Sequence, residues 1–106
     1  MRDLNITVKD KIANFTTRDG IIVCGNSDYR IKFTFDAEWN GKTKKARFIW
    51  NEQYEDVDID ENNYASVPVL SNTKKIIVGV YADNISTTAV TIPCVLSVLC
   101  EGGVNG

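Results

Sequence analysis

The sequence predicts an all-β fold: a single antiparallel β-sandwich, immunoglobulin-like or jelly-roll-like, with about eight short strands. Three observations indicate it. Apolar and polar residues alternate with a period of two along most of the chain, no helical period is sustained, and turn-forming residues recur about every 8–12 residues. A length of 106 residues leaves room for one domain with its own core.

The strands of the first half follow from this alternation. Residues 4–8 alternate between apolar and polar side chains, and the apolar run 21–24 ends in a cluster of turn formers. Residues 29–35 give the clearest half-buried strand, because every second side chain is apolar. Residues 36–39 are expected to form one helical turn capped by Asp36, with Trp39 closing the core as a lid.

Residues 46–50 and 57–59 predict a hairpin joined through residues 51–53. Pairing its apolar side chains face to face also sets basic side chains opposite acidic ones, which favours that register. The expected opposite pairs are Phe48–Val57, Ala46–Ile59, Arg47–Asp58 and Lys45–Asp60.

Three further strands complete the sandwich. Residues 64–69 and 90–100 each contain a proline, which indicates a sheet edge, a strand end or a bulge. Residues 76–81 are apolar on both faces and predict a central strand. The module is expected to span residues 1–101, and residues 102–106 to form a flexible, glycine-rich tail. The residues expected to be largely buried are Tyr29, Ile31, Phe33, Phe35, Phe48, Trp50, Val78, Val80, Ile92 and Leu96.

Three cysteines, an odd number, argue against a disulfide framework. Cys94 and Cys100 would lie about 20 Å apart in one strand, too far for a bridge, whereas Cys24 could meet either across a sheet. The N-terminus shows no apolar segment typical of a secretory signal. We therefore expect three reduced, buried thiols in a protein made in a cytoplasm.

Composition argues against several classes of function. A formal net charge of −2 gives no general attraction to nucleic acid, and no apolar stretch is long enough to enter a membrane as a span. The chain has no histidine, no close pair of cysteines and no glycine-rich phosphate loop. We expect no enzymatic activity, no catalytic residue, no bound metal and no cofactor.

Two charged segments have alternative interpretations. The acidic residues Asp56, Asp58 and Asp60 resemble a calcium loop, but the interleaved apolar residues favour a solvated strand face. The basic residues of segment 42–47 lie close to these acids, so a neutralised hairpin surface is favoured over a nucleic-acid site.

Tyrosines are the best candidates for surface contacts. Tyr54, at the tip of the predicted hairpin, is the strongest, and Tyr64 is the second. A role in the core or at its rim is the alternative for both. Trp39 and Trp50 fall on apolar faces and are expected in the core.

Several collinear segments resemble the N-terminal β-domain of tail, tail-fibre or baseplate-type proteins from phages and prophages of Clostridia and related Firmicutes. These segments are residues 1–13 (MRDLNITVKDKIA), 23–29 (VCGNSDY), 33–39 (FTFDAEW), 45–48 (KARF), 67–70 (VPVL), 78–82 (VGVYA) and 92–100 (IPCVLSVLC). In that family a longer, often helical or fibrous part follows the domain, whereas this chain ends at Gly106.

The resemblance implies a non-catalytic virion structural module, assembled in the bacterial host cytoplasm. Its expected partners are further copies of itself or other virion proteins, and the missing distal part favours attachment, a baseplate or decoration. One alternative is a carbohydrate- or host-surface-binding module that binds a glycan through loop aromatics; others are a capsid decoration protein and a small regulatory phage protein.

Overall fold

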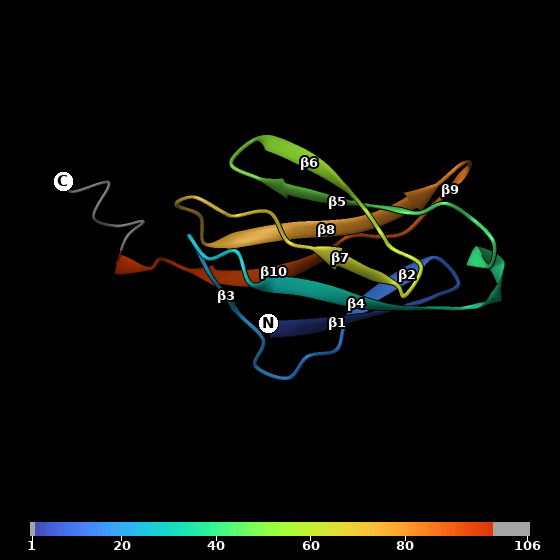
Figure 1. The fold of residues 1–106 in the computed structure, drawn as a ribbon, viewed down its shortest axis with the longest axis horizontal. Helices are drawn as coiled ribbons and strands as arrows, with labels where there is room; N and C mark the ends of the chain where they lie inside the picture. Colours follow the sequence, from blue (N-terminus) through green and yellow to red (C-terminus); the bar gives the residue numbers. More distant parts are fainter. Residues whose placement is uncertain (1, 99–106) are drawn as a thin grey trace.

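The computed structural model describes residues 2–98, which fold into ten β-strands and one short 3-10 helix. Four strands form one sheet in the order β2-β1-β4-β7: β1 (Arg2–Lys9), β2 (Ile12–Phe15), β4 (Tyr29–Phe35) and β7 (Tyr64–Ser66). The other sheet has the order β3-β10-β8-β5-β6: β3 (Ile22–Val23), β10 (Val90–Val95), β8 (Lys75–Ala82), β5 (Lys45–Trp50) and β6 (Gln53–Asp58). The short strand β9 (Ile85–Ser86) pairs with β8. Figure 1 shows both sheets along the length of the molecule.

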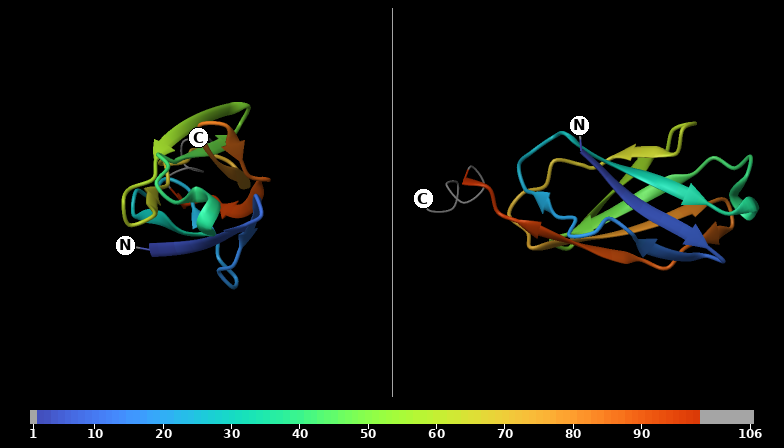
Figure 2. Two further views of the ribbon diagram at one scale, coloured as in Figure 1. Left: turned by 90° about the vertical axis from the view of Figure 1, so that its right-hand side faces the viewer. Right: turned by 90° about the horizontal axis from the view of Figure 1, so that it is seen from below.

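The predicted all-β fold is confirmed, and the two sheets face each other across a shared interior (Figure 2). Both sheets are mixed, however, rather than wholly antiparallel. β1 runs parallel to β4, and β10 runs parallel to β3. Between β1 and β4 the chain first forms β2 and then crosses to the other sheet at β3. Such a crossover lets a strand return to its own sheet in the original direction.

The core lies between the inward faces of the two sheets. Leu4, Ile6 and Val8 alternate inward from β1, as Ile76, Val78 and Val80 do from β8. Eight of the ten residues expected to be buried are buried; Phe35 and Leu96 are partly buried and pack against the core. β8 lies between β10 and β5, so the prediction of a central strand is confirmed.

The 3-10 helix η1 (Ala37–Trp39) closes one end of this core. Trp39 is fully buried, and its ring lies 5.2 Å from that of Phe35, so the expected lid is confirmed. Asp36 occupies the cap position but makes no capping hydrogen bond there. Its carboxylate instead accepts a hydrogen bond at 2.8 Å from the backbone N–H of Asp10, which ties η1 to the β1–β2 turn.

The predicted register of the β5–β6 hairpin was wrong by two residues. Trp50 pairs with Gln53, so only Asn51 and Glu52 form the turn, and both have positive φ angles, 48° and 61°. A two-residue turn in which both φ angles are positive has a backbone twist that matches the right-handed twist of the two strands it joins. The turn fixes the register and places Lys45 opposite Asp58 and Arg47 opposite Asp56.

Two predicted strands of the C-terminal half are shorter than expected: β7 ends at Ser66, before Pro68, and β10 ends at Val95. The expectation that Cys24 and Cys94 are buried free thiols is confirmed. Cys100, the end of the predicted module at residue 101 and the predicted tail 102–106 lie outside the described residues.

Candidate interaction face

The outer side of β6, β5 and β8 carries an exposed cross-strand row of large apolar side chains. Tyr54 lies directly opposite Ile49, Ile49 lies opposite Ile77, and Ile77 lies opposite Thr91 of β10. Tyr54 is 61% exposed and Ile49 is 38% exposed. We call this surface the β5–β8 face and the trio Tyr54, Ile49 and Ile77 the apolar row.

A network of polar side chains borders the apolar row. The Arg47 guanidinium donates two hydrogen bonds to the Asp56 carboxylate, at 2.7 and 2.9 Å. The Tyr81 hydroxyl donates to the same carboxylate at 2.8 Å. The guanidinium carbon of Arg47 also lies 4.1 Å from the centre of the Tyr54 ring, which stabilises the orientation of that exposed ring.

Electrostatics agree with this geometry. The hydrogen bonds from Arg47, assisted by the one from Tyr81, hold the pKa of Asp56 below its ordinary value. Donation to Asp56 raises the pKa of Tyr81 above its ordinary value. Arg47 and Asp56 therefore stay ionised at neutral pH and neutralise each other on the face.

A groove opens on the β5–β8 face beside Gly79. Its volume is about 460 Å³, and its lining includes Arg47, Ile49, Ile77, Gly79, Tyr81 and Thr87. An added Cβ at Gly79 would have its nearest neighbour at 3.7 Å, an ordinary van der Waals distance. A methyl group therefore fits at position 79, and a longer side chain there would extend toward the groove that Gly79 helps to line. A second hollow of about 340 Å³ continues past Ile49 and Ile77 toward Lys75.

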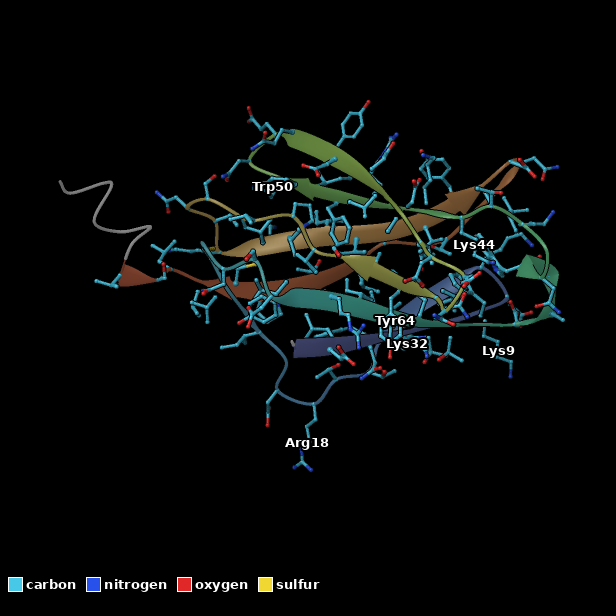
Figure 3. The ribbon with its side chains drawn as sticks, in the orientation of Figure 1. Lys9, Arg18, Lys32, Lys44, Trp50 and Tyr64 are labelled. Atoms are coloured by element: carbon cyan, nitrogen blue, oxygen red, sulfur yellow. The ribbon has the colours of Figure 1, made fainter. Side chains whose placement is uncertain are left out.

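The structure places the two predicted contact residues in different sheets. Tyr54 is exposed on β6, as expected for a surface residue. Tyr64 lies on β7, on the outer side of the other sheet, close to Lys32 in Figure 3. Its ring has the guanidinium carbon of Arg30 at 3.7 Å and the Lys32 Nζ at 4.6 Å from its centre. A contact role for either tyrosine stays a prediction.

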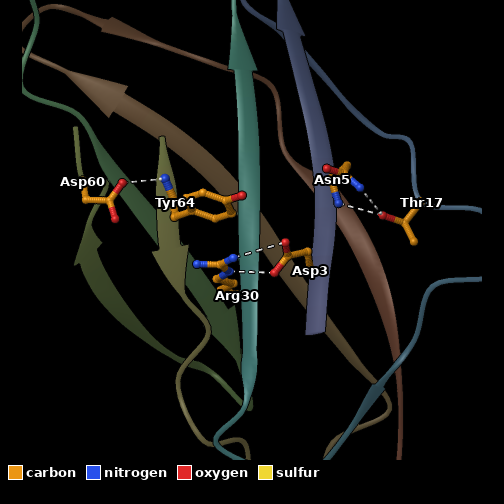
Figure 4. Close-up of polar contacts among 6 residues, drawn as sticks. All are labelled: Asp3, Asn5, Thr17, Arg30, Asp60 and Tyr64. Carbon is orange, nitrogen blue, oxygen red and sulfur yellow. Dashed lines mark hydrogen bonds and ion pairs between the residues drawn. The ribbon is translucent and has the colours of Figure 1, made fainter. Parts of the chain in front are cut away.

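Polar contacts hold the surroundings of Tyr64 in place (Figure 4). Arg30 donates hydrogen bonds to Asp3 on the neighbouring strand, at 2.6 and 3.3 Å. The Asp60 carboxylate accepts from the backbone N–H of Tyr64 at 2.9 Å. With Arg30 over its ring and its backbone tied to Asp60, Tyr64 offers less open surface than Tyr54.

The acidic segment has a structural explanation for each carboxylate. Asp56 pairs with Arg47, and Asp58 accepts a hydrogen bond at 2.8 Å from Lys45. Asp60 instead bonds the backbone N–H groups of the following turn. Over residues 2–98 no group of three or more cysteine, aspartate or glutamate residues is placed to hold a metal ion. Asp56 and Asp58 thus lie on a paired strand face in the corrected register, and Asp60 lies in the turn that follows it.

Four residues of this face were not predicted from the sequence as contact residues: Ile49, Ile77, Gly79 and Tyr81. The sequence did contain a feature that could have indicated this face: β8 is apolar on both of its sides and has a glycine in its interior. A glycine inside a central strand weakens it and often marks a place where another group approaches closely.

Comparison of the chain with protein-family models, curated proteins and solved structures gives no match. Because no solved structure matches, the immunoglobulin-like or jelly-roll-like assignment stays a prediction.

In the part that the structure describes, no helix is long and apolar enough to cross a membrane.

Proposed function

We propose that this chain is a non-catalytic structural module of a phage virion, a tail, tail-fibre or baseplate attachment domain that acts through protein–protein assembly. The observation that carries the proposal is the apolar row on the β5–β8 face, in which Tyr54 and Ile49 are exposed and Ile77 is half-buried. The phage assignment rests on the resemblance of the seven collinear segments; the assembly role rests on the face.

The composition of the face supports a protein partner. Tyrosine and arginine are enriched among residues that dominate protein–protein binding energy, and here Arg47 lies against the exposed ring of Tyr54. Arg47 and Asp56, at the centre of the face, are already paired within the chain, so burial by a partner leaves no lone charge at either of them. The groove at Gly79 offers a recess for a protruding side chain.

A glycan-binding role is the second candidate, because one observation favours it. The groove combines aliphatic side chains and Tyr81 with hydrogen-bonding groups of Arg47 and Ser86. Pockets for small ligands have this mixture of an apolar lining and a few polar groups. Titration of the 15N-labelled protein with oligosaccharides of the host cell wall tests this candidate.

The test of virion membership is the protein content of particles. Intact particles are purified by density gradient from an induced culture of the host that encodes the chain, and tails are then separated from heads. Mass spectrometry is expected to find peptides of this chain in the particle band, in several copies per tail. A chain found only in the soluble lysate, with the other virion proteins present in the band, would overturn the proposal.

A further inference from the structure

We infer that the β5–β8 face binds a second copy of the same chain, with Tyr54 of each copy inserted into the Gly79 groove of the other. This inference rests on the proposed assembly function and names its partner. It starts from a projection and a recess that occur on one face. Tyr54 is the most exposed aromatic side chain among the described residues, and the groove lies on the same side of the same sheet, lined in part by its neighbours Arg47 and Ile49.

The register fixes where projection and recess lie relative to each other. Tyr54 is on β6 and Gly79 on β8, two strands away, with β5 between them. Tyr54 belongs to the row of Ile49, whereas Gly79 lies opposite Arg47, two residues further along β5. Strand spacing and rise then separate the two positions by about 10 Å across the sheet and about 7 Å along it.

A two-fold axis can bring both pairs together at once. When two identical faces meet, a two-fold axis can lie in the plane between them. If that axis is perpendicular to the line from Tyr54 to Gly79 and passes through its midpoint, it exchanges the two positions. Tyr54 of each copy then faces Gly79 of the other, which is the self-complementary contact of a symmetric dimer. The apolar rows of the two copies flank this contact.

The electrostatics of the face allow two copies to meet. Arg47 pairs with Asp56 at 2.7 Å, and Lys45 pairs with Asp58 at 2.8 Å, each within its own chain. These two pairs neutralise the part of the face around Tyr54 and the groove, so two copies do not repel each other there. Contact with Arg47 also orders the Tyr54 ring before binding, which lowers the entropy lost on association.

Gly79 is not required by the packing of its own chain. A Cβ atom fits at position 79 without a steric clash, and β-branched residues stabilise central strands better than glycine does. Packing within the chain therefore does not require glycine there. An incoming ring from another molecule does require it, because a side chain at position 79 would occupy the groove.

Sedimentation equilibrium and concentration-dependent 15N spectra test the inference on the full chain, up to about 1 mM, a range that includes weak but specific contacts. The wild-type chain is expected to dimerise, with shifts confined to β5, β6 and β8. Tyr54→Ala and Gly79→Val should each raise the dissociation constant at least tenfold. Tyr64→Ala, a tyrosine on the other sheet, is the matched control and should leave it unchanged.

An equimolar mixture of the two variants gives the sharpest test. The mixed dimer regains one intact contact, between Tyr54 of the Gly79→Val chain and Gly79 of the Tyr54→Ala chain. The mixture should therefore associate more tightly than either variant alone, a result that a merely structural effect of the substitutions would not produce. Gly79→Ala replaces Gly79→Val if thermal melts show that the valine variant is less stable than the wild type.

Three results would overturn the inference: a wild-type chain that is monomeric at about 1 mM, dimers that both variants leave intact, or a mixture that gains nothing. Oligosaccharide-induced shifts at Gly79 in a monomeric chain would assign the groove to a glycan instead. None of these results bears on whether the chain is present in virions, so a failure of this inference can be told apart from a failure of the proposed function.

Discussion

Arg47 on β5 and Asp56 on β6 form a doubly hydrogen-bonded ion pair, with N–O distances of 2.7 and 2.9 Å. This pair connects the edge strand of the sheet to its interior, because Tyr81 of β8 donates to the same carboxylate. The side chain of Asp56 is only 23% exposed, whereas that of Asp58, in the neighbouring pair, is 80% exposed. Asp56 is therefore the carboxylate of this hairpin whose ionisation matters most to stability.

The first prediction concerns the pH dependence that follows. Because the folded state lowers the pKa of Asp56 from its ordinary value of 3.8, its contribution is present above that value and is lost as pH falls through the folded pKa. Asp56→Asn should reduce the free energy of unfolding by about 0.5–1 kcal/mol at pH 7, an amount typical of exposed or half-exposed pairs. Urea unfolding from pH 7 downward measures this.

The matched control for that experiment is Asp58→Asn, which removes the exposed partner of Lys45. It should change stability less than Asp56→Asn does. The difference between wild type and Asp56→Asn should shrink as the pH falls below about 4. Equal effects of the two substitutions, or a difference that grows in acid, would contradict the assignment of Asp56.

The second prediction concerns calcium. Asp56 and Asp58 are each paired with a basic side chain, and Asp60 bonds the backbone of its own turn. Thermal melts with millimolar calcium and with chelator should therefore superimpose. A calcium site at a hundredfold excess over its dissociation constant would add about 2.7 kcal/mol to stability, which such melts would detect readily. A calcium-dependent rise that Asp58→Asn abolished would restore the calcium-loop interpretation.

Which side of each strand is buried could be predicted from sequence, because the period of two is a local property. The register of the β5–β6 hairpin could not, because it depends on positive φ angles at Asn51 and Glu52, and glutamate is not a residue typical of that conformation. The parallel pairing of β1 with β4 depends on a crossover between sheets, which no local pattern encodes.

Only one residue of the candidate face, Tyr54, could be predicted from the sequence. Tyr54 stood out as an exposed aromatic at a hairpin, but its neighbours Ile49 and Ile77 come from two strands and meet only through the register. The groove at Gly79 likewise depends on which side chains surround the glycine. The hydrogen bond from Tyr81 to Asp56 joins residues that are far apart in the chain and needed the fold to bring them together.

The third prediction concerns the buried thiols. Burial raises the pKa of the Cys94 thiol to about 12, so almost no reactive thiolate forms at pH 8. In the native protein Cys94 should therefore react slowly with a thiol reagent, and denaturation should release it. Cys94→Ser should cost about 1–3 kcal/mol of stability, because a hydroxyl is costlier to bury than a thiol and its shorter C–O bond weakens the contact with the Ile92 carbonyl oxygen, 3.6 Å from Sγ.

Thiol counting is cleanest in a Cys100→Ser background, which leaves only Cys24 and Cys94. Two thiols should be titrated after denaturation without reductant. No free thiols under those conditions would indicate a Cys24–Cys94 disulfide and contradict the assignment of both as free. Cys94→Ala is the companion variant, since it keeps an apolar side chain at the site and should be less damaging than serine if the hydroxyl is the cause.

The last prediction concerns the turn that sets the register. Glu52 is exposed and holds a φ of 61°, a conformation that costs an ordinary residue about 1 kcal/mol and glycine almost nothing. Asn-Gly is the preferred pair for this two-residue turn, so Glu52→Gly should restore the favoured sequence. Glycine also gains freedom in the unfolded chain, which offsets part of the benefit. We expect a net stabilisation of about 0.5 kcal/mol, measured by urea unfolding with an unchanged m-value. Glu52→Ala removes the same carboxylate but keeps the strain, so it should give no such gain. If both variants were equally stabilising, loss of the glutamate charge rather than relief of backbone strain would be the cause, and the turn would not explain the register.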